Sequence, residues 1–378
     1  MSWKIPLFKI YYDKNDIDAV KESIKVGMHW AIGPAIQKFE SMLSNYLGMK
    51  YSLVFNSGTS ALHAALLAYD ISEGNEVIVP SFTFIATANA PLFVGAKPIF
   101  ADIEEETLGL DPEDVEKKIT RRTKAIIAVH YGGLPCRIEK LREIAKKNNL
   151  ILLEDAAESL GAKFNDKFIG IFGDASIFSF CQNKIITTGE GGAIVTNSKK
   201  IYEKLKLIRS HGRSESKDYF SSIGGENYIT LGYNFRMSNI NASLGIEQLK
   251  KIEKIIQMRI CKSQYFTRQL ANIPQIKPIF FSKKGRGVYQ LYSVKVNPKI
   301  RNKLIKYLAD RGIMSKVYFN PVHQTHFYKK ILRYKIRLPV TEHISKSILS
   351  LPMFPHIKKT EINFIVAQLK NFFKTYRR

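Results

Sequence analysis

Cysteine, acidic residues and long apolar runs are all scarce in this sequence. The three cysteines, Cys136, Cys181 and Cys261, are widely separated and form no C-x-x-C pair. This spacing argues against a disulfide framework or a zinc site, and it is compatible with a reducing compartment. We therefore expect a cytoplasmic protein that binds no metal.

Membrane-spanning segments are not expected either. The N-terminal residues contain no apolar core of signal-peptide length. The uncharged run from Val77 to Ala96 is long enough to span a bilayer, but it contains Pro80, Asn89 and Pro91. We interpret this run as a strand, a loop and the start of a helix.

Acidic residues number 33 against 58 Lys plus Arg, which gives a formal net charge of +25. Such a charge is compatible with nucleic acid, a membrane surface or an anionic substrate. The basic residues are scattered, however, and alternate with apolar residues at helical spacing, as in KKIEKIIQMR. This pattern is typical of solvated faces of amphipathic helices, so we expect neither nucleic acid nor a membrane as partner.

The order of the expected elements indicates an α/β protein. Strands are predicted at 51–55, 76–80, 97–102, 124–130, 150–155 and 176–180, and helices at 15–26, 36–47, 61–69, 138–147 and after Asp111-Pro112. Such alternation predicts a mainly parallel sheet flanked by helices. No internal repeat interrupts it.

A smaller α+β unit is expected to follow. The segment 211–223 is polar and predicts a mobile loop, and a long helix begins near residue 242. Beyond it we predict strands at 289–296 and 314–318 and helices at 301–311 and 361–373. The division is placed between residues 1-250, a large domain with the N-terminal segment, and residues 251-378, a small domain.

Lys184 follows an apolar strand-like run and precedes a glycine-rich turn, in the stretch SFCQNKIITTGEGGA. A bare ammonium at the end of a buried strand is costly, so such a lysine is paired, neutral or used covalently. The typical covalent use is a bond to a carbonyl or to pyridoxal phosphate. A lysine that extends to the surface beside a loop is the alternative.

A phosphate site is one interpretation of Gly58, Thr59 and Ser60. These residues lie between a strand and an alanine-rich helix, and a helix N-terminus binds phosphate through its amides and dipole. A plain helix cap is the other interpretation. In the next loop, Phe82 or Phe84 is expected either to lie against a cofactor ring or to belong to the core.

Two carboxylates, Glu154 and Asp155, end the strand LILLED. Open α/β sheets place their chemistry at such strand ends. Asp155 is expected to hold a pyridinium nitrogen or to cap the following turn, and Glu154 to point away because side chains alternate along a strand. His323 and His326 have a spacing that suits metal ligands, but no neighbouring Cys or acid supports a metal site.

Taken together, these motifs resemble those of the DegT/DnrJ/EryC1/StrS family of pyridoxal-phosphate-dependent nucleotide-sugar aminotransferases. The resemblance rests on Gly58-Thr59-Ser60, PSFTFIATAN, EDAA, SFxxxK and TTGEGG, in that order, and continues through GYNFRMSN, PVH and SLPMFP. It implies the aspartate-aminotransferase-like fold, fold type I, and a homodimer whose active sites are shared between subunits.

The resemblance also implies roles for individual residues. Lys184 is the lysine that bonds to pyridoxal 5'-phosphate and shuttles protons, and Asp155 pairs with the ring nitrogen. Phe84 stacks on the ring, Glu158 lies near the ring hydroxyl, and Asn234 reaches the phosphate of the neighbouring subunit's cofactor. Phosphate binding is assigned to Gly58, Thr59, Ser60 and Ser179. The candidate substrate residues are Asn183, Arg236 and His323.

The motifs EDAAE and NKIITTGEGG resemble the branch that includes the GDP-perosamine synthases. They imply transfer of an amino group from L-glutamate to C4 of a nucleotide-diphosphate 4-keto-6-deoxy sugar. Amination at C3, or another fold-type-I enzyme such as a dehydratase, desulfurase or aldolase, is the alternative, since fold does not fix reaction. A basic DNA-binding regulator without catalysis is a more distant one.

Overall fold

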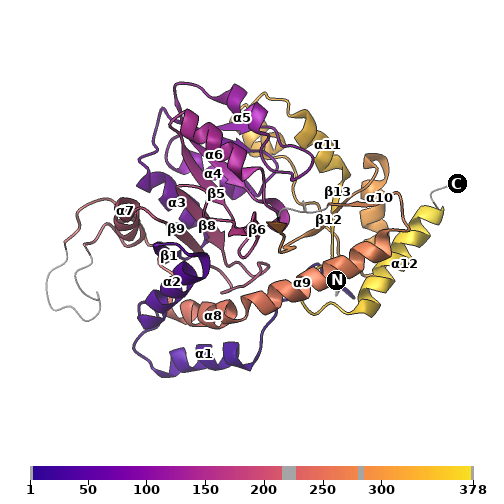
Figure 1. The fold of residues 1–378 in the computed structure, drawn as a ribbon, viewed down its shortest axis with the longest axis horizontal. Helices are drawn as coiled ribbons and strands as arrows, with labels where there is room; N and C mark the ends of the chain where they lie inside the picture. Colours follow the sequence, from indigo (N-terminus) through magenta and orange to yellow (C-terminus); the bar gives the residue numbers. More distant parts are fainter. Residues whose placement is uncertain (1–2, 215–226, 280–284, 376–378) are drawn as a thin grey trace.

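The computed structural model describes residues 3–214, 227–279 and 285–375. A seven-stranded sheet of order β1-β9-β8-β5-β4-β2-β3 forms its centre (Figure 1). The strands are β1 (Tyr51–Phe55), β2 (Glu76–Pro80), β3 (Lys97–Ala101), β4 (Thr123–Val129), β5 (Ile151–Asp155), β8 (Ala175–Ser179) and β9 (Gly192–Thr196). All pairings from β8 to β3 are parallel. β9 runs antiparallel to both of its neighbours, β1 and β8, and the expected mainly parallel sheet is confirmed.

Helices cover both faces of this sheet (Figure 1). They are α1 (Lys14–Lys25), α2 (Pro34–Leu47), α3 (Gly58–Ala68), α4 (Ile85–Phe93), α5 (Pro112–Lys118), α6 (Ile138–Lys147), α7 (Lys199–Arg209) and α8 (Asn239–Lys250). Asp13 forms a capping box at α1, and Asp111 caps α5 with Pro112 in the first turn, as its sequence predicts.

The C-terminal part adds a second, smaller sheet and four helices. The sheet β10-β12-β13 contains β10 (Lys277–Pro278), β12 (Tyr292–Lys295) and β13 (Ile348–Leu351). The helices are α9 (Ile252–Leu270), α10 (Pro298–Ala309), α11 (Pro339–Ser347) and α12 (Lys359–Thr375). Short ribbons and turns complete the described chain: β6 (Lys163–Phe164), β7 (Lys167–Phe168), β11 (Gly285–Arg286), η1 (Tyr131–Gly133), η2 (Val322–Gln324) and η3 (Phe327–Ile331).

Two expectations about the elements differ from the structure. No strand forms at 314–318, where Lys316 makes only a single bridge to Ser350. The helix expected from residue 242 is two helices, because Lys251 has the non-helical angles φ −109° and ψ 10°. Most of the loop expected at 211–223 lies outside the described residues.

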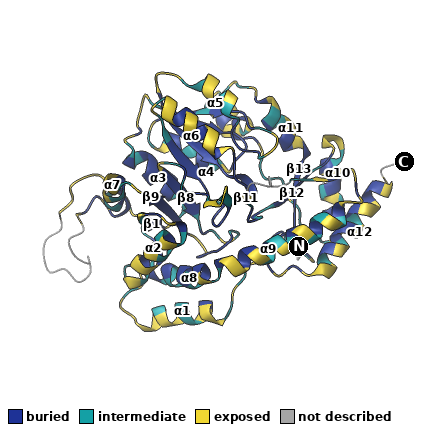
Figure 2. Ribbon diagram, viewed as in Figure 1, coloured by how far each residue is buried: buried dark blue, intermediate teal, exposed yellow. Residues whose placement is uncertain are grey.

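Strand residues alternate between two hydrophobic clusters, one on each face of the large sheet. In Figure 2 the central strands are mostly dark blue, the colour of buried residues. Val54, Ile78 and Leu152 pack with α2, α6 and α8, whereas the adjacent residues pack with α3, α4 and α7. Both faces are therefore apolar, as in parallel sheets covered by helices. Polar side chains end β5 and β8, at Asp155 and Ser179, and the candidate site lies at this edge of the sheet.

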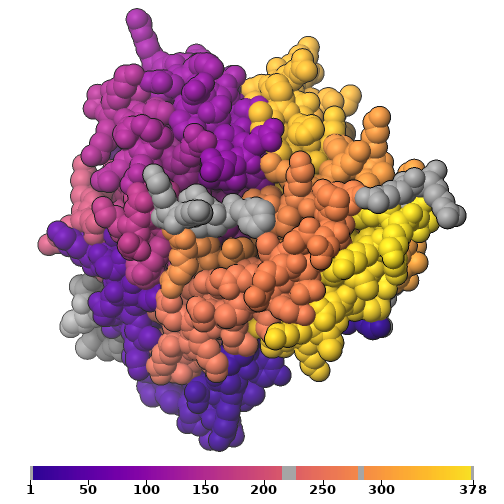
Figure 3. Space-filling view, turned by 45° about the vertical axis from the view of Figure 1, so that its right-hand side comes forward, coloured from indigo at the N-terminus to yellow at the C-terminus, as the bar shows by residue number. Residues whose placement is uncertain are grey.

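A third cluster joins α9, α10 and α12 to the small sheet, and it also includes Ile5 near the N-terminus. Space-filling atoms of the C-terminal residues, yellow in Figure 3, lie beside the orange residues that precede them. The division between residues 250 and 251 stays a prediction. Ile5 crosses it, since this residue bridges Ile313. Among the described residues, no helix has the length and apolarity needed to cross a membrane.

Candidate active site

Asp155 ends β5 at the carboxyl edge of the parallel strands, and its side chain is buried. Thr87 Oγ1 donates to Oδ2 at 2.7 Å, and the Ala157 amide donates to Oδ1 at 3.2 Å. Burial raises the pKa of this carboxyl group, and the hydrogen bond from Thr87 opposes the rise. A protonated ring nitrogen would supply the positive charge that this buried anion needs, so Asp155 fits the expected cofactor.

Glu154 faces the opposite side of β5, as expected, and its carboxylate accepts several hydrogen bonds. Its oxygens accept hydrogen bonds from the Ser176 hydroxyl, from His130 Nε2 at 3.0 Å and from the amides of Gly170, Phe172 and Gly173. Burial alone would raise the pKa of Glu154, but these bonds lower it overall. Glu154 is therefore a structural anion that ties the 170–173 turn to the strand.

Lys184 lies in the turn after β8, and not at the strand end, because β8 stops at Ser179. Its Nζ lies 3.5 Å from Glu158 Oε1, and its side chain is 15% exposed. Glu158 also accepts a hydrogen bond from the Gly132 amide at 2.8 Å. The Lys184 charge acts on Asp155 and lowers the pKa of that carboxyl group against the effect of burial. The two predicted catalytic groups are thus electrostatic neighbours.

The N-terminus of α3 contains Gly58, Thr59 and Ser60 in its first turn, three residues earlier than expected. Ser57 is the cap, and its Oγ accepts the Ser60 amide at 3.0 Å. The amides of Gly58 and Thr59 lie at the end where a helix offers no acceptor of its own. A Cβ on Gly58 would lie 3.1 Å from Ser179 Cβ, so glycine lets these groups meet. This arrangement fits a phosphate group.

Phe82 and Phe84, the two candidates for stacking on a cofactor ring, differ in exposure. Phe82 is fully buried against Tyr131, with ring centroids 5.2 Å apart. Phe84 is 60% exposed at the N-cap of α4 and leans toward Phe319. Only Phe84 offers a ring face to a ligand.

The remaining predicted residues are more dispersed. Asn183 accepts a hydrogen bond from Gln290 through its backbone and touches Tyr318 through its side chain. Asn234 is exposed, and its backbone carbonyl accepts from Asn56, just before α3. Arg236 donates to Ser210 at 3.3 Å.

His323 does not join this group. Its ring is buried, with Nδ1 2.7 Å from Ser81 Oγ. Nε2 lies 3.4 Å from Glu342 Oε1. In this conformation the ring faces protein, and it therefore does not meet a substrate directly.

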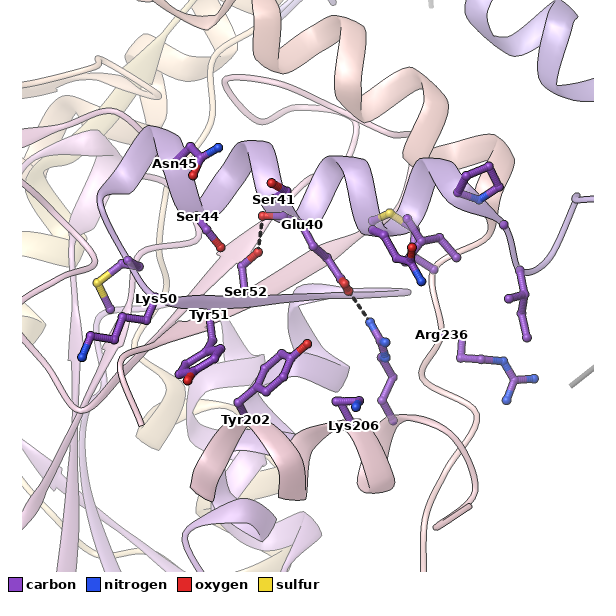
Figure 4. A pocket seen from close by; sticks show the side chains of 18 of the residues that line it. Glu40, Ser41, Ser44, Asn45, Lys50, Tyr51, Ser52, Tyr202, Lys206 and Arg236 are labelled. Atoms are coloured by element: carbon purple, nitrogen blue, oxygen red, sulfur yellow. Dashed lines mark hydrogen bonds and ion pairs between the residues drawn. The ribbon is translucent and has the colours of Figure 1, made fainter. Parts of the chain in front are cut away.

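One large cavity lies away from these groups. It has a volume of about 830 Å³ and follows the outer edge of β1 between α2 and α7, as Figure 4 shows. Arg236 is the one predicted site residue in its lining. Glu40 and Arg209, which also line the cavity, bond to the Val54 amide and carbonyl and so cover part of this sheet edge.

Sequence reasoning missed Thr87 and Tyr318 at the site. Tyr318 contacts Asn183, and the nearby Glu158 contributes to raising its phenol pKa, after burial. Tyr318 had been assigned to a strand that does not form. Thr87 lies within the PSFTFIATAN motif, four residues after Thr83, but only the fold brings it to Asp155. No group of three or more potential metal ligands occurs among the described residues.

A mainly parallel central sheet flanked by helices is consistent with the fold-type-I enzymes that use pyridoxal phosphate. The chain belongs to the DegT/DnrJ/EryC1/StrS aminotransferase family, whose profile matches residues 11–370. It is a nucleotide-sugar aminotransferase, and its cofactor is pyridoxal phosphate.

Individual relatives cover nearly the whole chain. GDP-perosamine synthase of Escherichia coli O157:H7 is 35% identical, with 98% of each chain covered. UDP-4-amino-4,6-dideoxy-N-acetyl-beta-L-altrosamine transaminase of Campylobacter jejuni is 34% identical, with 93% of each covered. The structure of Helicobacter pylori PseC, an aminotransferase of pseudoaminic acid biosynthesis, superimposes with a TM-score of 0.91 at 32% identity, over 99% of this chain and 100% of that one.

Proposed function

We propose that this aminotransferase moves an amino group from L-glutamate to C4 of a nucleotide-diphosphate 4-keto-6-deoxy sugar, as a GDP-perosamine synthase does. The observation that supports it most is the similarity to GDP-perosamine synthases over almost the entire chain. The basic character of the protein suits both a dicarboxylate donor and a diphosphate acceptor.

Cofactor binding is assigned to the groups at the carboxyl edge of the sheet. Pyridoxal phosphate, when bound, supplies an aldehyde that bonds to amines and a ring that withdraws electrons from the substrate carbon. The amides of Gly58 and Thr59, with Ser60 and Ser179, would hold its phosphate. Asp155 would pair with its ring nitrogen, Phe84 would cover a ring face, and Glu158 would lie near the ring hydroxyl.

Lys184 is proposed to carry protons. Its Nζ is within 3.5 Å of Glu158 and close enough to Asp155 to influence its pKa. A free amine at this position could take a proton from the substrate carbon and deliver it to the cofactor carbon, because the long, flexible lysine side chain would reach both atoms. The ion pair with Glu158, at 3.5 Å, holds Nζ near that carboxylate.

A homodimer with shared sites is proposed for the assembly. Asn234 is exposed in a segment next to α3, and the preceding residues Tyr228, Ile229 and Leu231 expose apolar side chains. An exposed apolar strip beside a functional segment favours contact with a second copy. Asn234 would then reach the partner's cofactor phosphate. Arg236, two residues later, is a candidate for the donor carboxylate, and Asn183 for the sugar.

Amination at C3 and dehydration are the competing reactions. Some family members that replace the lysine with histidine are dehydratases, and this chain has Lys184. The test is incubation of the purified protein and pyridoxal phosphate with L-glutamate and either a GDP- or a UDP-linked 4-keto-6-deoxy sugar. A 4-amino product identified by mass spectrometry and NMR supports the proposal. A 3-amino or deoxygenated product contradicts it.

A further inference from the structure

Two threonine hydroxyl groups form an ordered chain that ends on Asp155. Thr83 Oγ1 lies 2.9 Å from Thr87 Oγ1, and Thr87 Oγ1 donates to Asp155 Oδ2 at 2.7 Å. An ionised carboxylate can only accept hydrogen bonds, so the Thr87 proton points to Asp155. Thr83 must then donate to Thr87. The direction of both bonds follows from the charge on Asp155.

This chain of hydroxyls is shielded from solvent. Thr83 and Thr87 are 3% and 1% exposed, and Asp155 is 6% exposed. In such surroundings a hydrogen bond to a charged group counts for more than it does in water, and a missing donor is costly. Besides Thr87, the Ala157 amide is the donor to this carboxylate among the described residues. Thr87 therefore provides the bond to Oδ2.

The segment that carries the threonines is fixed at its start. Ser81 accepts the His323 amide at 3.0 Å and contacts Nδ1 of the same residue, and the Ser81 carbonyl accepts the Val322 amide at 2.9 Å. The C-terminal part of the chain thus locks the loop that also carries Phe84. A rigid support of this kind lets a hydroxyl hold a carboxylate in one orientation.

We propose that Thr87, oriented by Thr83, is a positioning residue that holds the Asp155 carboxylate ionised and aimed at the cofactor's ring nitrogen. The inference rests on the proposed role of Asp155. The physical reason is that a hydrogen bond to the charged form favours that form, in opposition to burial. Without this donor, Asp155 takes up a proton at higher pH and no longer attracts a protonated ring.

The experiment measures the dissociation constant of pyridoxal phosphate by equilibrium dialysis over a range of pH. Thr87→Val keeps the shape and removes the hydroxyl, and Thr87→Ser keeps the hydroxyl. We expect Thr87→Val to weaken binding by roughly tenfold or more, because a hydrogen bond to a charged group is lost. Thr87→Ser should stay within about threefold of wild type, and Thr83→Val should fall between the two.

The pH profile separates this role from packing. In the wild type, affinity should fall on acidification as Asp155 is protonated, and in Thr87→Val the fall should begin at higher pH. Thr341→Val is the matched control, because this buried threonine has a hydroxyl without a hydrogen-bond partner among the described residues. It should leave both affinity and profile unchanged.

Equal losses in Thr87→Val and Thr87→Ser, with an unmoved pH profile, would reduce Thr87 to a packing residue and overturn the inference. Unchanged binding in Thr87→Val, together with weak binding in Asp155→Ala, would also overturn it. Unchanged binding in Asp155→Ala would instead refute the proposed role of Asp155, on which the inference rests.

Discussion

The adjacent carboxylates at the end of β5, Glu154 and Asp155, differ in the number of hydrogen bonds that they accept. Glu154 accepts several hydrogen bonds from amides, a hydroxyl and an imidazole. Among the described residues, Asp155 accepts two hydrogen bonds, from the Thr87 hydroxyl and the Ala157 amide. A fully bonded buried anion serves the fold, whereas a buried anion with few partners can still gain from a cation. This difference supports a structural role for Glu154 and the proposed role of Asp155 in cofactor binding.

Asp155→Asn is expected to stabilise the cofactor-free protein at neutral pH while weakening cofactor binding. Burial raises the folded-state pKa of Asp155 above its usual value. Its contribution to stability is therefore greatest below the unfolded pKa and declines as pH rises through the folded pKa. The side-chain amide in Asp155→Asn does not ionise, so the stability of the variant does not decline with pH for this reason.

This prediction is tested by thermal unfolding of cofactor-free wild type and Asp155→Asn between pH 4 and 8, and by titration of both proteins with the cofactor. The melting temperature of the variant should exceed that of the wild type by a few degrees at pH 8, and the gap should shrink toward pH 4. A gap that grows on acidification would contradict the assignment.

Glu154→Gln is expected to destabilise the protein by about 2–4 kcal/mol, because the amide nitrogen would face buried donors. Urea denaturation provides the measurement. Glu143→Gln is the control, since Glu143 is exposed and, within the described part of the chain, pairs with Lys140 alone. Its stability should change by at most about 0.5 kcal/mol. Similar effects of both changes would show that the Glu154 bonds contribute little.

The junction of β9 with α3 lies beside the proposed phosphate site. A Cβ on Gly192 would lie 2.5 Å from the backbone carbonyl of Ser57 and 2.6 Å from the Gly58 amide nitrogen. Both atoms belong to backbone, so neither can rotate away. The close approach of this strand to the helix N-terminus depends on glycine.

Gly192→Ala is accordingly expected to displace the start of α3. We predict a loss of about 1–3 kcal/mol in stability, typical of overpacking, and a weakening of cofactor binding by roughly tenfold. Gly48→Ala is the comparison. An alanine there would be strained by the left-handed φ of 70°, but its added Cβ would contact nothing within 4 Å. It should lower stability without specific loss of cofactor affinity. Equal affinity in both variants would argue against the phosphate assignment.

Much of this architecture is predictable from local sequence. The strands of the large sheet and α6 follow the expected ranges closely, because apolar runs and caps are local signals. The failed strand at 314–318 and the split at Lys251 depend on distant packing. Thr87 was missed for the same reason, since its partner Asp155 lies 68 residues away. The burial of His323 against Ser81 is likewise a product of the fold.

For the whole molecule, the proposed shared site predicts complementation between inactive subunits. Lys184→Ala and Asn234→Ala should each reduce activity strongly. In a mixed dimer, one site has Lys184 from one subunit and Asn234 from the other, and is intact. Random mixing of the two variants after dissociation should therefore restore about a quarter of wild-type activity. No recovery, with dimer exchange demonstrated by mass spectrometry, would contradict a shared site.

The central claim is that Lys184 bonds covalently to the cofactor. Borohydride reduction of the pyridoxal-phosphate-loaded protein, followed by peptide mass spectrometry, tests it most directly. The account predicts one labelled peptide, with the pyridoxyl group on Lys184, and no specific label in Lys184→Ala. A label on a different lysine, or a protein that takes up no cofactor, would contradict it.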